Sequence, residues 1–167
     1  MILVYTGDGK GKTSACVGQA MRALGQGMRV AFYQYLKRND AGGEQRILQQ
    51  LLQDDFIAGG VGFLTKPEQF PRHREVALRL TEKALVKAAV CEMLILDEAL
   101  YALTAGILTE EELRRIMGVC EECGVHLVLS GRGMPEWVRE VAHLVTEMSV
   151  VKHPYMQNVP ATRGIEF

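Results

Sequence analysis

The feature that most constrains this chain is a glycine-rich segment between an apolar run and a helical pattern. The apolar run Ile2–Tyr5 predicts a short buried strand, the pattern Lys12–Leu24 predicts a helix, and TGDGKGKTS at 6–14 joins them. Glycines let such a loop curl until successive backbone N–H groups point inward, and the helix N-terminus adds its positive dipole. Because this arrangement suits phosphate oxygens, the sequence predicts an α/β protein that binds a nucleotide polyphosphate.

The loop is a shortened form of the Walker A pattern G-x-x-x-x-G-K-[ST]. Gly11 matches the second glycine, Thr6 stands in place of the first, and Gly7 lies one residue closer. Lys12 contributes a point charge, and the Thr13 hydroxyl can coordinate Mg²⁺. The alternative, a turn that binds nothing, is disfavoured by the alternating glycines and the paired lysines. We expect the triphosphate to be bound by Gly7, Asp8, Gly9, Lys10, Gly11, Lys12, Thr13 and Ser14.

An acidic pair follows a predicted strand farther along the chain, in LILDE at 94–98. Asp97 is expected to hold Mg²⁺ (or Mn²⁺) directly or through water, and Glu98 to join it or to orient a reacting group. Open α/β sheets bind ligands at the C-terminal ends of their strands, which favours this reading over a strand that merely ends in solvated acids. The predicted metal site is therefore Thr13, Asp97 and Glu98.

Composition narrows the class of function. The 167 residues carry 19 Lys and Arg against 20 Asp and Glu, a net charge of −1. Proteins whose main ligand is a long polyanion are usually basic, so we expect neither nucleic-acid binding nor binding to an anionic membrane. No apolar run reaches the about 18 residues of a membrane span and no basic leader precedes the first strand, so we expect a cytoplasmic protein. Four cysteines in a chain of this length are no disulfide framework.

Short apolar runs alternate with longer helical patterns. This alternation predicts one α/β domain over residues 1–167, with a mostly parallel sheet of about five or six strands flanked by helices. Further strands are predicted at Arg29–Leu36, Met93–Leu96, Val125–Leu129 and Leu144–Met148. Further helices are predicted at Pro71–Ala89, from a capping box at Thr109 to about Cys123, and at Pro135–His143. Residues 37–70, rich in Gly, Gln and Asp, are expected to form mobile substrate loops.

Several motifs together resemble one family, the P-loop ATP:corrinoid adenosyltransferases, which act on cob(I)alamin or cob(I)yrinic acid a,c-diamide. The resemblance spans almost the whole chain and implies a RecA-like P-loop NTPase fold that forms a homodimer. Its motifs are the phosphate loop, GGE at 42–44, LILDE at 94–98 with Tyr101, LSGRG at 129–133, VKHPY at 151–155 and GIE at 164–166.

The resemblance implies transfer of the 5′-deoxyadenosyl group of ATP to the cobalt of a reduced corrinoid, in cobalamin biosynthesis or salvage. Co(I) attacks the ribose C5′ and triphosphate leaves, so the protein needs no activated Ser, Cys or His nucleophile. The phosphate loop then neutralises charge on the leaving group. We expect Lys12, Glu98 and Arg132 as catalytic residues, a corrinoid facing Phe63, and a partner reductase that supplies the electron for Co(I).

The sequence departs from the family pattern in two ways. Many members carry an N-terminal extension that closes over the active site, whereas this chain begins at its first strand. Some members present a Phe-x-Trp pair that helps to displace the lower cobalt ligand. Here Phe63 matches the first aromatic residue and Thr65 stands in place of the tryptophan.

Other polar and aromatic residues leave two interpretations open. Glu44 is either a ribose or Mg²⁺ contact or an ordinary acid at a helix N-terminus. Arg132 lies near phosphates or corrin amides, or is a surface arginine in a turn. Lys152 and His153 either contact the ligands or cap the last strand. Cys120-x-x-Cys123 is interpreted as ordinary packing and partly exposed thiols, because zinc needs four ligands and redox cysteine pairs lie at helix N-termini. Trp137 is interpreted as a packing anchor and not as a stacking partner for a cofactor.

Two other classes of function compete with adenosyl transfer. A small P-loop kinase would move the γ-phosphoryl group, but it normally needs an arginine-rich lid, and residues 37–70 offer few cations. A RecA-like nucleotide-dependent module that assembles on nucleic acid is opposed by the neutral charge. The products of the reaction distinguish these classes.

Overall fold

The computed structural model describes residues 1–40 and 42–167, and in this part of the chain six strands form one sheet. The strand order is β3-β2-β4-β5-β1-β6, and every neighbouring pair is parallel. The strands are β1 (Ile2–Thr6), β2 (Val30–Gln34), β3 (Phe56–Ala58), β4 (Met93–Asp97), β5 (His126–Ser130) and β6 (Leu144–Glu147). The predicted parallel α/β sheet is confirmed.

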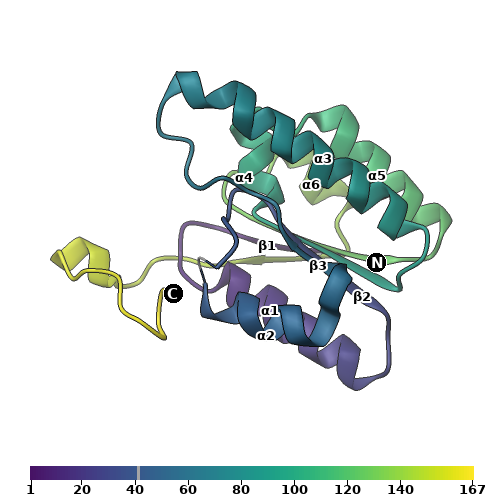
Figure 1. Ribbon diagram of the computed structural model, residues 1–167, viewed down its shortest axis with the longest axis horizontal. Helices are drawn as coiled ribbons and strands as arrows, with labels where there is room; N and C mark the ends of the chain where they lie inside the picture. Colours follow the sequence, from purple (N-terminus) through teal and green to yellow (C-terminus); the bar gives the residue numbers. More distant parts are fainter. Residues whose placement is uncertain (41) are drawn as a thin grey trace.

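Helices cover both faces of the sheet (Figure 1). One face carries α1 (Lys12–Gly25) and α2 (Gly43–Leu52), and the other carries α3 (Phe70–Ala88), α4 (Ala99–Thr104), α5 (Glu110–Glu122) and α6 (Glu136–Val141). Short 3-10 turns lie at Gln53–Asp55, Pro67–Gln69 and Pro154–Gln157. The layers are those of a doubly covered parallel sheet.

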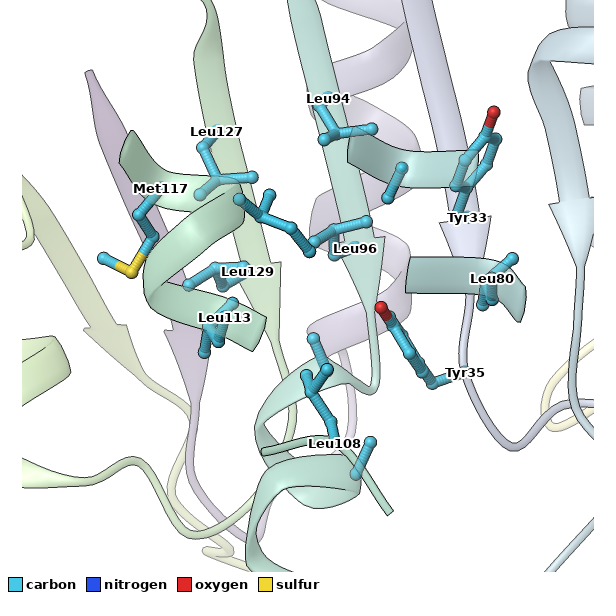
Figure 2. Packing of buried hydrophobic residues seen from close by; sticks show 14 of the residues in the cluster. Tyr33, Tyr35, Leu80, Leu94, Leu96, Leu108, Leu113, Met117, Leu127 and Leu129 are labelled. Carbon is cyan, nitrogen blue, oxygen red and sulfur yellow. The ribbon is translucent and has the colours of Figure 1, made fainter. Parts of the chain in front are cut away.

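Strand β4 explains why the apolar runs are continuous. Its side chains alternate between the two layers, because successive residues of a strand point to opposite faces. Leu94 and Leu96 pack in the layer under α3–α6, and Met93 and Ile95 pack in the layer under α1 and α2. Figure 2 shows the first layer, where Leu94 and Leu96 lie beside Leu127 and Leu129 of β5. Both faces are apolar since both are buried.

Strand β6 differs from the other five. It pairs only with β1, at the edge of the sheet, and all four of its residues are exposed. The strand predicted at 144–148 is therefore confirmed, but it is exposed at the edge and not buried on both faces. An edge strand has one free side, and no described helix packs over Leu144 and Val145 in the way α1 and α5 cover the central strands.

Three elements were not predicted from the sequence. Within 37–70, where only loops were expected, the structure has α2 and β3, while Ala41 of that segment lies outside the described residues. Helix α2 buries Gln45, Leu48 and Leu52 at helical spacing, and a glutamine in the first of these positions hides the apolar stripe. Strand β3 has three residues, too few for a periodic pattern. Helix α4 begins directly after Glu98 and has only six residues, and this position was interpreted from the sequence only as the end of a strand.

The predicted helix ends agree well with the structure. The capping box of α5 is present, since the Glu112 N–H donates to Thr109 Oγ1 (3.2 Å) and the Thr109 N–H donates to Glu112 Oε2 (2.9 Å). Helix α1 begins at Lys12 and ends at Gly25. Pro135 is the N-cap of α6, one position before the predicted first turn. None of the helices in the described residues is long and apolar enough to cross a membrane.

The packing of β4 leads to a stability prediction. Leu96 is fully buried in the centre of the sheet, so Leu96→Ala should lower the free energy of unfolding by about 2–5 kcal/mol, measured by urea denaturation. Val86 on α3 is 73% exposed, so Val86→Ala is the matched control and should change it by less than about 0.5 kcal/mol. Equal effects of the two substitutions would contradict the described core.

Candidate functional site

The phosphate loop packs tightly against the chain that follows β6. The Gly9 N–H donates to the Met148 carbonyl at 2.7 Å. A Cβ atom on Gly9 would lie 2.6 Å from that oxygen, and one on Gly7, which has φ of 96°, would lie 2.5 Å from it. Larger residues would push the loop away from this neighbour. The glycines are therefore required for close packing as well as for the curl of the loop.

Lys12 lies inside the curl of the loop. Its side chain is buried, and Nζ donates to the carbonyls of Gly7 and Gly9, each at 2.7 Å. Burial lowers the pKa of Lys12, and the nearby carboxylate of Glu98 acts in the opposite direction. The ammonium is thus held at the first turn of α1, where a phosphate group would meet both its charge and the helix dipole.

Asp97, at the end of β4, is the centre of a buried polar network. Its side chain has no solvent exposure. Ser130 Oγ donates to Oδ1 at 2.6 Å, Gln34 Nε2 donates to Oδ2 at 3.0 Å, and the Thr13 hydroxyl lies 3.1 and 3.2 Å from the two oxygens. The donors come from β5, β2 and α1. The parallel sheet brings them together, since the C-terminal ends of its strands share one edge.

Lys37 supplies the charge that compensates this carboxylate. Its Nζ lies 3.0 Å from Asp97 Oδ2, 2.8 Å from Thr13 Oγ1 and 3.4 Å from Glu44 Oε1. Burial lowers the pKa of Lys37, but the carboxylates of Asp97 and Glu44 outweigh it and hold the pKa above its usual range. Lys37 is therefore charged at neutral pH and, from the loop after β2, bridges the end of β4, the start of α1 and the start of α2.

Glu98 follows in the left-handed conformation, with φ of 61°. Its N–H donates to Ser130 Oγ at 3.0 Å, so this hydroxyl fixes Asp97 and the backbone of Glu98 together. Burial, and next the charge of Asp97, raises the pKa of Glu98. Non-glycine residues seldom adopt this backbone conformation, and it turns the Glu98 side chain toward the pocket that holds the phosphate loop.

A pocket of about 870 Å³ brings most of the predicted residues together. Phe63 in its lining is 85% exposed, and Arg132 lies 3.6 Å from Asp8 Oδ1. Gly7 and Asp97 lie behind the lining, and Lys152 does not reach it. The pocket is lined by 8–14, Val17, Lys37, Gly43, Glu44, Ile47, Phe63, Glu98, Arg132, His153 and 164–167.

The segment Gly164–Phe167 reaches back over the loop. Lys10 Nζ donates to the Ile165 carbonyl at 2.5 Å and lies 3.9 Å from Glu166 Oε1. Lys10, expected to meet triphosphate, therefore also pairs with this segment. In Figure 1 the segment carries the end of the chain back toward α1 and α2.

Sequence reasoning missed three polar members of the Asp97 network: Gln34, Lys37 and Ser130. Gln34 and Ser130 are each the polar last residue of a strand, directly after an apolar run, and this was the available signal. Lys37 was noted only as a cation of a loop segment. Gln45 Nε2 donates to Gln34 Oε1 at 2.8 Å, which orients the Gln34 amide so that its Nε2 faces Asp97.

The remaining candidates lie away from this pocket. Cys120 is buried in the core and Cys123 is exposed at the end of α5. The Arg114 guanidinium stacks 3.9 Å from the centroid of the Trp137 ring, which packs against the core as predicted. In residues 1–40 and 42–167 no three His, Cys, Asp or Glu side chains cluster as a metal site. Mg²⁺ does not need such a cluster, because one or two carboxylates, substrate phosphates and water suffice.

A second pocket of about 600 Å³ contains Arg38, Arg72 and the buried His73. Burial, and then the charge of Arg72, lowers the pKa of His73. In the window between that lowered value and the ordinary one near about 6.5, the unfolded chain binds more protons than the folded one. This histidine therefore makes stability fall as the pH falls through the window.

We predict that His73→Gln removes this part of the pH dependence. The wild type should lose stability as the pH falls below about 6.5, whereas the variant should give a flatter profile in urea unfolding. Arg72→Gln should flatten the profile in part, since Arg72 is the smaller cause of the shift. An unchanged profile in His73→Gln would show that this imidazole is not held neutral by the fold.

Comparison with known proteins adds an independent result. The model of the family ATP:corrinoid adenosyltransferase BtuR/CobO/CobP matches residues 1–167. A corrinoid adenosyltransferase of Sinorhizobium sp is 34% identical over all of this chain and 80% of its own length. A corrinoid adenosyltransferase of Pseudomonas aeruginosa is 33% identical over all of this chain and 83% of its own length. Corrinoid adenosyltransferase CobA of Salmonella typhimurium is 30% identical over all of this chain and 85% of its own length.

A solved DNA replication initiation factor has a TM-score of 0.44 and 14% identity, over 88% of this chain and 39% of that one, a likeness too weak to bear on function. The full-length match to the family model and the identity to several members agree with each other and with the motifs around the phosphate loop. This chain belongs to the ATP:corrinoid adenosyltransferase family.

Proposed function

We propose that this protein transfers the 5′-deoxyadenosyl group of ATP to the Co(I) of a reduced corrinoid and releases triphosphate, in cobalamin biosynthesis or salvage. One observation carries the proposal. In a member of this family, the phosphate loop, the Asp97 network and an exposed aromatic side chain, Phe63, meet at a single large pocket. Such a pocket can hold a triphosphate at one end and a large planar ligand at the other.

The chemistry fits what the pocket contains. Co(I) attacks the ribose C5′ with its own electron pair, a Co–C bond forms, and the C5′–O bond breaks. The electron pair of that bond leaves with the triphosphate, and cobalt is formally oxidised to Co(III). The cobalt is the nucleophile, so the protein acts by positioning the reactants and by stabilising the leaving group.

The loop residues are proposed to stabilise the triphosphate. Residues 8–14, which include the α1 N-terminus, line the pocket, and the Lys12 ammonium already lies among the loop carbonyls. Arg132 and Glu98 also line the pocket, and we assign them to the phosphates and to orientation of the reacting groups. Glu44, Lys10, Asp8 and Ser14 are proposed as nucleotide contacts on the same grounds.

A divalent cation, Mg²⁺ or Mn²⁺, is proposed to bind at Thr13 and Asp97, with Glu98 nearby. The donor chemistry fits, because hydroxyl and carboxylate oxygens are the ligands that these ions prefer, and a cationic ammonium already lies among them. When bound, the ion neutralises negative charge on the leaving triphosphate. Ser130 and Gln34 orient the carboxylate through their hydrogen bonds.

Other parts of the proposal rest on the family resemblance. We propose a homodimer, a partner reductase that delivers the electron for Co(I), a cytoplasmic location, and one domain spanning residues 1–167. The exposed apolar side chains of β6 are consistent with a surface that a second copy covers. Phe63 is proposed to face the corrinoid, with Thr65 at the position of the family tryptophan.

Product analysis tests the function directly. Protein, ATP, Mg²⁺ and a chemically reduced corrinoid are incubated without oxygen, and the products are separated by chromatography. The proposal requires adenosylated corrinoid and triphosphate in equal amounts. Formation of ADP and phosphate alone would instead indicate a kinase or an ATPase, and salt-sensitive DNA binding would favour the nucleic-acid module.

We predict that Phe63→Ala raises the KM for the corrinoid by about 10- to 100-fold, because burying a phenylalanine side chain contributes about 1.5–3 kcal/mol. The KM for ATP should stay the same, since Phe63 does not belong to the phosphate loop and its apolar side chain has no group that binds phosphate. Steady-state kinetics with each substrate varied in turn measure both values. Val86→Ala, an exposed apolar change on α3, is the control, and an equal rise in both KM values in Phe63→Ala would contradict this assignment.

A further inference from the structure

Lys37 contacts the same oxygen atoms that the proposed divalent cation would need. Its ammonium lies 2.8 Å from Thr13 Oγ1 and 3.0 Å from Asp97 Oδ2. These are the two oxygens proposed to bind the divalent cation. An ammonium and a metal ion cannot both contact the same two oxygens at these distances, so Lys37 and the metal are alternatives at Asp97.

The ammonium is well matched to this position. A lysine ammonium has three N–H donors, and Lys37 has three oxygens around it, the third being Glu44 Oε1 at 3.4 Å. In the described part of the chain Lys37 is the one cation within 4 Å of Asp97. The other partners of this carboxylate (Thr13, Gln34 and Ser130) are neutral.

The burial of Asp97 makes a cation partner necessary. Its side chain is completely buried, and an uncompensated charge at such a position is strongly unfavourable. Two cations can therefore satisfy it in turn: the tethered ammonium or a metal ion. A tethered cation has a high effective concentration, so it excludes a free ion that competes for the same oxygens.

Triphosphate offers the ammonium another partner. The Lys37 side chain lines the same pocket as the phosphate loop, and its flexible stem lets the charge move within that pocket. A bound triphosphate supplies both a new anion for Lys37 and further oxygen ligands for the metal. Exchange at Asp97 is then favourable only when the nucleotide is present.

We propose that Lys37 is a tethered cation that occupies the metal position at Thr13 and Asp97 and yields it to a divalent ion only when nucleotide binds. Lys37 is thus a positioning residue that couples metal binding to ATP binding. The inference rests on the proposed metal role of Thr13 and Asp97 and does not depend on the corrinoid reaction.

Binding of Mn²⁺ alone tests the proposal. The full chain is titrated with Mn²⁺ without nucleotide or corrinoid, and free Mn²⁺ is measured by electron paramagnetic resonance. Lys37→Met should bind one Mn²⁺ at least about tenfold more tightly than the wild type, because the competing charge is gone and the Asp97 carboxylate is left without a cation. Lys66→Met, which removes a lysine away from this pocket, should bind Mn²⁺ as the wild type does.

Two further variants keep the result interpretable. Adding Asp97→Asn to Lys37→Met should abolish the gain, which locates the ion at this carboxylate. Lys37→Gln, which keeps a polar side chain without the charge, should show the same gain and serves if the methionine variant does not unfold cooperatively. The proposal is wrong if neither Lys37 variant binds Mn²⁺ more tightly than the wild type, or if the gain persists without Asp97.

The outcome is separate from the test of function. If the wild type forms no adenosylated corrinoid but the Lys37 variants gain the Mn²⁺ site, the transfer reaction is wrong and the role of Lys37 stands. If the wild type adenosylates the corrinoid and the variants gain no site, the coupling is wrong and the reaction stands.

Discussion

A carboxylate without solvent exposure must be compensated inside the protein, and at Asp97 this requirement organises the site. Its partners Ser130, Gln34, Thr13 and Lys37 come from the ends of two strands, the start of a helix and the loop after β2. These partners can reach Asp97 only because the two strand ends, the start of the helix and the loop all lie at the same edge of the sheet. The network therefore depends on the parallel sheet and links the phosphate loop to the strands around β4.

The sheet order explains which residues meet. Strand β4 lies between β2 and β5, so the residues at the ends of these neighbours, Gln34 and Ser130, flank Asp97 directly. Strand β1 lies on the other side of β5, which brings the phosphate loop and Thr13 to the same edge. Met148, directly after the exposed edge strand β6, is the residue against which the loop glycines pack. Binding chemistry is thus concentrated where five strands end together.

Much of the fold could be predicted from the sequence because its signals are local. Apolar runs mark strands buried on both faces, a glycine-rich turn marks the phosphate loop, and Thr109 with Glu112 marks the start of α5. The prediction failed where the local signal is weak. Helix α2 places Gln45 on its buried face, and β3 is only three residues long. Strand β6 was predicted as a strand, but its exposed position at the edge was not.

The sequence by itself determined the glycine-rich loop before α1 and the acidic end of β4, because each is encoded by neighbouring residues. Only the tertiary structure decided that Lys37 faces Asp97 across 60 residues of sequence and that Ser130 holds both Asp97 and the backbone of Glu98. The physical reason is that periodicity specifies which side of an element is buried. It does not specify which elements become neighbours, and charge compensation at a buried carboxylate is a property of those neighbours.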